Sequence, residues 1–460
     1  MVLDWTGEFS LYMQWPFTIV VGVLLIAALA SVVLSFVGSL LDIASALKLR
    51  DLLMRLVILS GIALVGLIGA WILLTIFTPR ESYGIFESVF MQFTPVWISL
   101  IVVFGLSYTF RKRLSLYGKL FNSWVGIIGL FIVLFWFFTA VFADQIALFD
   151  PIDQVSGMKN KKPGTPVRGL EDAWYLLGGD NLARDVFSRV VHGARSVMII
   201  APFATLFAFM VGVTLGLPAG YFGGRMDTVL SFLANLVLAF PVILLFYLLV
   251  NREIVETGIP MYLAAVLFLL PIMFVVVFIY SRYETRPEVM VPALSVAVII
   301  GFWAYSGLAF NADPLGVWGM SPNLLNVFVS VVFVNSPTVF RIVRGLTMDI
   351  KTRDYVAAGQ TRGEGPWYIM LWEILPNARG PLIVDFCLRI GYTTILLGTL
   401  GFFGLGVEPE SADWGSTIND GRKLLNIYPH PALPPAIALM SLVLGLNLLA
   451  DGLREQSLKD

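Results

Sequence analysis

Few side chains in this sequence could carry out covalent or acid–base chemistry. His192 and His430 are the only histidines of the 460 residues and lack the spacing of metal ligands. The single cysteine, Cys387, lies in an apolar run, where it is expected to be a small packing residue. The patterns G-x-x-x-x-G-K-[ST], H-E-x-x-H and G-x-S-x-G do not occur. We therefore expect no catalytic site, no metal site and no bound cofactor in this chain.

A polar stretch at 354–376 is the best candidate for an interaction site, because it lies between two long apolar runs. Its charges are too many for hydrocarbon; they are Arg353, Asp354, Arg362, Glu364 and Glu373. Within it, Trp367–Leu375 is almost wholly apolar and would gain nothing from facing water. Such a patch is typical of a docking site for another protein, although an ordinary helical connector is the alternative. We expect the surface of a partner protein to cover this apolar segment.

The same stretch has clear signals for two helices and a break. Met348–Thr361 contains good helix formers and no proline, which favours one short helix. Gly363 and Gly365 are expected to end it, because glycine adopts backbone angles that other residues resist. Pro366 suits the first position of a second helix, and Pro376 is expected to end that helix about three turns later.

The composition is that of a membrane protein. Hydrophobic residues make up 58% of the chain and charged residues 13%, against about 25% charged in ordinary soluble domains. A membrane helix needs about 20 mostly apolar residues. Eleven stretches meet this requirement: 17–40, 53–77, 94–110, 120–143, 197–218, 228–250, 260–281, 289–310, 324–345, 382–403 and 432–451. We expect an all-α polytopic membrane protein surrounded by lipid, and the net charge of −1 suggests no nucleic-acid partner.

The distribution of lysine and arginine predicts the orientation, because cytoplasmic loops are enriched in both. Most of these residues follow odd-numbered spans, as in Lys48, Arg50, Arg111, Lys112, Arg113, Lys119, Arg225, Arg282, Arg286, Arg344, Lys351 and Arg353. The N-terminus is then outside, and the C-terminus and the loop 346–380 are cytoplasmic. The loop 144–196 argues against this with Lys159, Lys161, Lys162, Arg184, Arg189 and Arg195. Because five spans separate it from 346–380, we still place it outside.

The polar stretch resembles the cytoplasmic EAA loop of membrane permeases in binding-protein-dependent ABC importers, written E-A-A, three residues, G, then I-x-L-P or a near variant. The positions in register are Ala358, Gly363, Ile374, Leu375 and Pro376. Ala357 replaces the usual glutamate and Gly359 the second alanine. The resemblance implies a helix that sits in a groove of an ATPase subunit and transmits its closure. It assigns this coupling role to Asp354, Tyr355, Ala357, Ala358, Gly363, Trp367, Ile374, Leu375 and Pro376.

A second resemblance, over about 111–250 and 323–460, is to the C-type permeases of dipeptide, oligopeptide and nickel importers. Its motifs include Leu177–Asp180, Arg184–Arg189, Gly193–Arg195, Gly216–Asp227, Ala239–Pro241, Trp414–Gly415 and Asp420–Arg422. It implies an extracytoplasmic mouth or docking site for a solute-binding protein at Asp180, Arg184, Asp185, Arg189, Trp414 and Asp420. From spacing alone, Asp180 could cap a helix whose arginines point to lipid head groups; an amphipathic lead-in with no partner is the alternative.

These patterns divide the chain into an extension and a core. The expected parts are an N-terminal extension with about three spans at 1–110 and a permease core at 111–460. Within the core we expect the extracytoplasmic loop 144–196, an inserted transmembrane hairpin at 251–322 and the coupling loop 346–380. The extension and the hairpin would pack peripherally or bind an accessory subunit.

The resemblances imply the permease subunit of an ATP-driven importer for peptides, in the cytoplasmic (inner) membrane of a prokaryote. Its partners would be a second homologous permease, two ABC ATPases that bind ATP and Mg, and an extracytoplasmic solute-binding protein. A nickel or other non-peptide importer of the same family is one alternative. An ion-coupled secondary transporter is another, although charged residues within the spans are nearly absent. Arg389, the exception, is interpreted as reaching toward the cytoplasmic interface, with a position facing a central cavity as the alternative.

Overall fold

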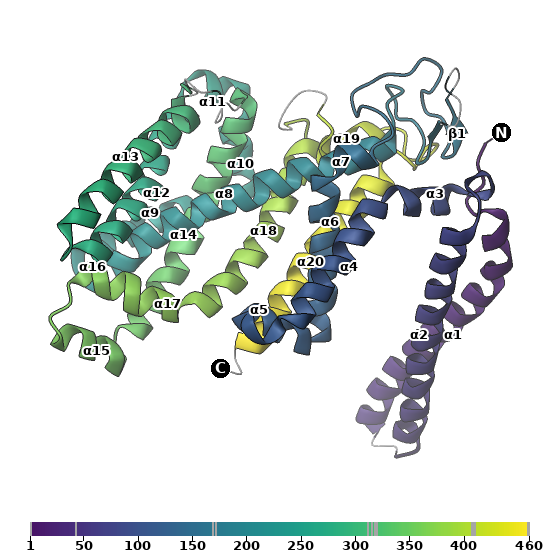
Figure 1. Cartoon of the computed structure of the whole chain (residues 1–460), viewed down its shortest axis with the longest axis horizontal. Helices are drawn as coiled ribbons and strands as arrows, with labels where there is room; N and C mark the ends of the chain where they lie inside the picture. Colours follow the sequence, from purple (N-terminus) through teal and green to yellow (C-terminus); the bar gives the residue numbers. More distant parts are fainter. Residues whose placement is uncertain are drawn as a thin grey trace. The chain divides into compact units, whose positions relative to one another are not determined.

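The computed structural model describes residues 2–41, 44–167, 170, 173–310, 312–313, 316, 321–405 and 411–457, and their regular structure is almost wholly helical (Figure 1). The all-α fold class is therefore confirmed. The chain forms two compact units, one of Met1–Thr94 with Lys161–Gly179 and the other of Pro95–Asn160 with Asp180–Asp460.

The first unit is built on a pair of long apolar helices, α1 (Glu8–Leu41) and α2 (Ala44–Phe77), which pack along each other. A short 3-10 helix, η1 (Arg80–Ser82), leads into α3 (Ile85–Gln92). The buried Glu87 carboxylate accepts hydrogen bonds from the backbone N–H groups of Gly7 and Gly84, both at 3.1 Å. This carboxylate therefore ties the start of α3 to the segment that leads into α1. Strands β1 (Thr165–Pro166) and β2 (Trp174–Tyr175) pair antiparallel.

The second unit carries the remaining helices. They are α4 (Thr94–Thr109), η2 (Arg111–Arg113), α5 (Ser115–Lys119), η3 (Leu120–Asn122), α6 (Trp124–Val141), α7 (Ala143–Ile146), α8 (Val186–Phe222), α9 (Gly224–Leu238), α10 (Val242–Val250), α11 (Arg252–Glu256), α12 (Ile259–Tyr283), α13 (Pro287–Phe310), α14 (Pro322–Ile350), α15 (Asp354–Thr361), α16 (Pro366–Tyr368), the π-helical η4 (Ile369–Ile374), α17 (Leu375–Asn377), α18 (Arg379–Phe402), α19 (Trp414–Arg422) and α20 (Leu433–Ser457). The third predicted span thus groups with this unit, where Trp97 packs on Phe135 with ring centroids 5.3 Å apart.

The number of spans agrees with the sequence. In the part of the chain that the structure describes, 9 helices are long and apolar enough to cross a membrane, or up to 11 if each of two bent helix pairs counts as one span. The pairs are α3 with α4 and α9 with α10, the latter bent by 82°. The second bend lies at Pro241, whose ring cannot continue the preceding helix.

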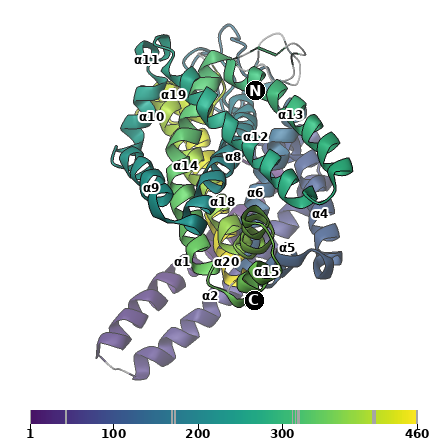
Figure 2. The same cartoon turned by 90° about the vertical axis from the view of Figure 1, so that its left-hand side faces the viewer.

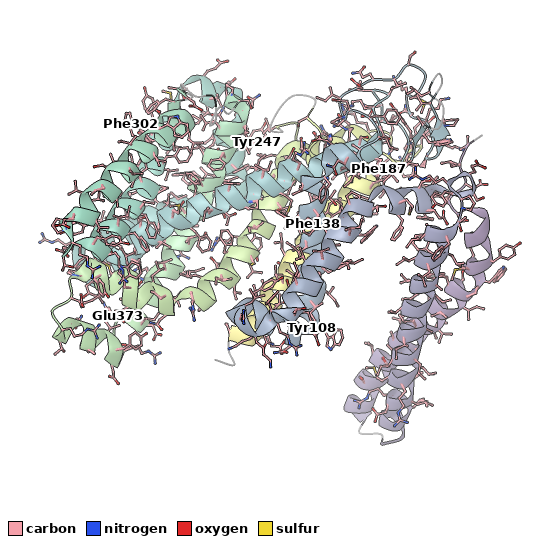
Figure 3. All side chains as sticks on the ribbon, in the orientation of Figure 1. Tyr108, Phe138, Phe187, Tyr247, Phe302 and Glu373 are labelled. Carbon is pink, nitrogen blue, oxygen red and sulfur yellow. The ribbon has the colours of Figure 1, made fainter. Side chains whose placement is uncertain are left out.

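The elements of the second unit alternate between two ends, which is visible in two views (Figures 1 and 2). One end holds α5, α15 and the C-terminus, and we call it the basic end because it carries Arg111–Arg113, Arg353 and Arg454. The opposite end holds α7, α11 and α19. In Figure 3, Glu373 lies at the basic end and Phe187 lies near the start of α8, toward the opposite end.

Two helices of this unit, α6 and α20, meet at backbone distance. A Cβ added to Gly452 of α20 would lie 2.3 Å from the Cα of Gly126 in α6. One added to Gly129 would lie 2.3 Å from the backbone nitrogen of Leu449. Membrane helices approach this closely only through small residues, so these glycines fix the spacing of the pair.

The expectation that Arg389 reaches toward the interface is wrong. Arg389 lies near the middle of α18, is 9% exposed, and pairs with Asp385 one turn earlier at 2.6 Å. Its Nη1 also donates to Thr338 Oγ1 of α14 at 2.5 Å. A neighbouring carboxylate and hydroxyl thus satisfy the guanidinium within the helix bundle.

Candidate coupling site and outer polar cluster

The short helix α15 presents one face to solvent and one to the chain. Asp354 begins it, where a negative charge interacts favourably with the helix dipole. Val356 and Gly359 are buried. The exposed positions include Asp354, Tyr355, Ala357 and Ala358, and the Tyr355 side chain is the largest among them at 39% exposed. We call these four residues the α15 face.

The helix boundaries differ in part from those predicted. The first helix begins at Asp354 rather than Met348, because α14 continues to Ile350. Gly363 breaks it as predicted, with a left-handed φ of 82°. Pro366 begins the second helix as predicted, but Pro376 does not end it, since helical structure continues to Asn377. Pro376 lies in the first turn of α17, directly after the wider turn of η4, where its missing N–H is tolerated.

The expectation that a partner covers the apolar segment is wrong for most of it. Ile369, Met370, Leu371 and Ile374 are buried within the chain itself. The core around them comes from three long helices, through Phe209, Val213 and Leu217 of α8, Val339 and Val343 of α14, and Leu382 of α18. We call Pro366–Asn377 the anchor segment, because it seats the loop in the helix bundle.

Trp372 of the anchor segment is partly buried and faces α12. Its ring centroid is 4.8 Å from that of Phe278, and the guanidinium of Arg282 lies 4.7 Å from its centroid. Its Nε1–H donates to Ser281 Oγ at 3.2 Å. Trp367 is also only partly buried against the same core.

A charged contact joins the two helices of the loop. Arg362, at the end of α15, donates to Glu373 Oε1 of the anchor segment at 2.8 Å. The arginine side chain is 55% exposed, and such pairs contribute little to stability. Behind the loop, Lys351 Nζ donates to the carbonyl of Gly220 at 2.8 Å, which links the ends of α14 and α8.

The nine coupling residues predicted by resemblance therefore fall into two groups. The exposed ones are Asp354, Tyr355, Ala357, Ala358, Gly363 and Pro376. Ile374 is buried, and Trp367 and Leu375 are partly buried. The first group is therefore the most accessible to a partner, and Ile374 is not accessible.

At the opposite end of the unit, the second predicted set converges on one polar cluster. Arg184 Nε donates to Asp180 Oδ2 at 2.6 Å, and its Nη2 donates to Asp420 Oδ2 at 2.8 Å. The Arg184 and Asp180 side chains are each 1% exposed, whereas Asp420 is 29% exposed. This pairing joins the segment before α8 to α19, which lies more than 200 residues away in the chain.

Arg189 and Trp414 extend the cluster. The Arg189 guanidinium donates to Thr417 Oγ1 at 3.2 Å and to the Ser411 carbonyl at 2.9 Å. The Trp414 indole donates to the Val190 carbonyl at 2.8 Å and packs edge-on against Trp136, with centroids 5.0 Å apart. The Arg189 and Trp414 side chains are fully buried, so this end of α8 is firmly attached to α19.

The local prediction for this segment needs two corrections. Asp185, not Asp180, caps α8, because its carboxylate accepts from the Ser188 backbone N–H at 2.9 Å. Arg184 and Arg189 do not point to lipid head groups, because buried oxygen acceptors take up their donors. Asp180 instead accepts from the backbone N–H groups of Leu182 and Arg184 in the turn before the helix.

Asp185 supports a prediction about pH. Burial raises the pKa of Asp185 from 3.8 to about 6, and its Oδ1 has no hydrogen-bond partner among the described residues. The folded chain therefore binds this proton more tightly than the unfolded chain, so ionised Asp185 lowers stability above about pH 6. The cost disappears as the pH falls from about 6 to below 3.8. We expect Asp185→Asn to raise the apparent melting temperature at pH 7.5 and to lose this advantage by pH 4.

The measurement is thermal unfolding in detergent across that pH range. Asp144→Asn is the control, because a hydrogen bond from Arg195 lowers the pKa of Asp144 instead. That variant is expected to be no more stable than the original chain at pH 7.5. A stabilisation by Asp185→Asn that did not change with pH would contradict the prediction.

The sequence analysis did not identify the residues that contact the site residues Trp372, Arg189 and Arg389. They are Phe278, Ser281 and Arg282 around Trp372, Thr417 and Ser411 around Arg189, and Asp385 beside Arg389. The Asp385–Arg389 spacing of four residues was a detectable helical ion-pair signal. The others come from distant segments and leave no local signal.

Comparisons with known proteins place this chain among membrane transport components. The family model described as "Binding-protein-dependent transport system inner membrane component" matches residues 289–457. The chain is 31% identical over 281 residues to a glutathione transport system permease protein of Pectobacterium atrosepticum, covering 61% of this chain and 71% of the relative. It is 26% identical over 339 residues to a dipeptide transport system permease protein of Alkalihalophilus pseudofirmus, covering 74% and 87%. A di/tripeptide permease protein of Pseudomonas aeruginosa is 27% identical over 327 residues, covering 71% and 85%.

Proposed function

Because this chain belongs to the family of binding-protein-dependent transport system inner membrane components, we propose that it imports peptides as one permease subunit of an ATP-driven assembly. The chain is a transport component rather than an enzyme. The peptide specificity is proposed because these relatives are named as transport system permeases for glutathione, dipeptides and di- or tripeptides. A nickel or other non-peptide solute remains the alternative within the family.

The main observation behind the coupling mechanism is that the loop at 354–377 has an exposed part, α15, and a buried part, the anchor segment. The α15 face is exposed, and two of its four residues are alanines, so the helix could fit into a groove of an ATPase. The anchor segment is buried among α8, α14 and α18, three long helices that each meet the length and hydropathy of a membrane span. A displacement of α15 by a closing ATPase would therefore be passed to these helices, and alternating access would follow from differential ATP binding to the two states. ATP and Mg would be bound by two ATPase subunits.

The proposed orientation puts the basic end in the cytoplasm of a prokaryote and the opposite end outside, with the N-terminus outside. The arginines of 144–196 argue less against this once their partners are considered. Arg184 pairs with Asp180, Arg189 is buried, and Arg195 pairs with Asp144 at 2.8 Å. Each of these arginines therefore has partners within the chain that account for its presence at this end.

The outer polar cluster would support the extracytoplasmic mouth. Asp180, Arg184, Asp185, Arg189 and Trp414 are buried and would hold this rim in place rather than contact the solute-binding protein directly. Asp420, the most exposed of the six, is the member proposed to touch that protein. A second homologous permease would complete the pathway.

The test is uptake of labelled di- and tripeptides by liposomes that contain this chain, its partner permease and the ATPases. We expect uptake that requires both internal ATP and the solute-binding protein. Uptake by the purified chain alone, driven by an ion gradient without ATP, would instead support a secondary transporter. The Asp385–Arg389 pair inside α18 is the observation that favours that second candidate. Uptake of nickel but not of peptides would support the non-peptide alternative.

A further inference from the structure

The hairpin formed by α12 and α13 contacts the coupling loop directly. The stretch 251–322 that contains it lies outside the two regions with permease motifs, although the family model extends over α13 from residue 289. No residue of α13 before Gly307 is buried inside the chain, and Phe302 is 67% exposed (Figure 3). Phe274 and Val277 of α12, by contrast, pack against the core around the anchor segment. One helix of the hairpin is thus tied to the loop.

Three residues in the last turns of α12 contact Trp372. Phe278, Ser281 and Arg282 are spaced i, i+3 and i+4, so they lie on one face of the helix. Phe278 and Arg282 contact the indole ring at 4.8 Å and 4.7 Å between the centres. We call this set the Trp372 clamp.

The hydrogen bond between Trp372 and Ser281 can form in only one direction, with the indole as the donor. Ser281 is 5% exposed, and its hydroxyl donates to the Phe278 carbonyl at 3.0 Å. An oxygen lone pair of Ser281 is therefore free to accept from Trp372 Nε1–H at 3.2 Å. The indole N–H is a donor only, so the buried serine and the indole satisfy each other in one orientation of the ring.

We propose that the α12–α13 hairpin is a positioning element for coupling, which holds the anchor segment through the Trp372 clamp. The inference rests on the proposed function and adds a role for the hairpin. A loop seated only on α8, α14 and α18 could tilt between its two helices at Gly363. Trp372 instead joins the anchor segment to a fourth helix, so a push on α15 is delivered to the bundle rather than absorbed locally.

The first experiment uses the purified chain and needs no transport. Hydrogen exchange of the amides of 366–377 is compared in the original chain, Trp372→Phe and Arg282→Gln. Cation–π contacts contribute about 0.5–1 kcal/mol at exposed sites, so we expect exchange about two- to fivefold faster in both variants. Tyr280→Phe and Arg286→Gln are the controls, because the first removes only the exposed Tyr280–Glu284 hydrogen bond and the second an exposed charge at the hairpin turn. Unchanged exchange in both clamp variants would overturn the proposal.

The second experiment measures ATP hydrolysed per peptide imported by the reconstituted assembly. We expect Trp372→Phe and Arg282→Gln to bind the ATPases in normal amounts but to raise this ratio at least about twofold, from the same contact energies. A purely structural role would lower the amount of assembly and leave the ratio unchanged, and that result would overturn the proposal. If the original chain neither retains an ATPase nor imports peptide with ATP, the proposed function fails instead, and the exchange experiment still tests the clamp.

Discussion

Replacing Ala358 with tryptophan should abolish stable association with the ATPase subunits. Ala358 lies on the exposed α15 face, where small side chains leave the helix backbone accessible. A large ring there would hold the two proteins apart without disturbing the core, because the buried side of α15 is formed by Val356 and Gly359. Disruption at the centre of an interface commonly costs 2 kcal/mol or more, about thirtyfold in affinity. Co-purification of ATPase from detergent, and ATP-driven uptake, are the measurements.

The matched control is Ala312→Trp, which adds the same ring at an exposed alanine between α13 and α14. This control variant should retain the ATPase in the original amount. Equal retention by the Ala358 and Ala312 variants would mean that the α15 face is not the contact. Loss from both would point to a general defect in the assembly, which the melting temperature of each purified chain would reveal.

The second large effect is expected from Arg184→Met in the outer polar cluster. The change leaves the Asp180 carboxylate 1% exposed and removes its 2.6 Å partner, so that the nearest guanidinium is that of Arg189, whose Nε lies 3.9 Å away. Removing one member of a buried ion pair typically costs about 3–5 kcal/mol. We therefore expect a marked fall in the apparent melting temperature of the purified chain. The double variant Asp180→Asn with Arg184→Met should recover part of the loss, because it removes the buried charge.

Arg195→Met is the control for that measurement. Its partner Asp144 is 72% exposed and the arginine 36%, and exposed pairs contribute about 0–1 kcal/mol. Its melting temperature should stay close to that of the original chain. An Arg184 variant as stable as the Arg195 variant would show that the cluster does not hold α8 to α19.

Local patterns predicted the spans and the break in the loop well, but not the start of its first helix or the end of its second. The eleven predicted spans fall within the 9 to 11 candidates of the described residues, and Gly363 and Pro366 marked the break and restart of the loop correctly. These features depend on periodicity and backbone preference, which neighbouring residues determine. Asp185 was missed as a cap because Asp180 and Asp185 both precede the helix, and only the hydrogen bond to Ser188 distinguishes them.

The tertiary contact partners of these residues could not be predicted in the same way. The apolar segment Trp367–Leu375 was predicted to be a surface for another protein. Its apolar character shows that it must be shielded from water, but not which residues shield it. Its cover comes from Phe209, Val339 and Leu382, which are contributed by three separate helices. The arginines of the outer cluster were misplaced for the same reason, since Asp420 and Thr417 lie more than 200 residues away along the chain.

The glycine contacts between α6 and α20 limit how this protein can move. Where the glycines bring the two backbones together, rolling either helix about its axis would drive a side chain into the backbone of the other. During a transport cycle α6 and α20 would therefore move together as one rigid pair, and changes in helix orientation would occur elsewhere in the bundle. Spin labels placed on the outer surfaces of α6 and α20 should therefore keep one separation through every nucleotide state.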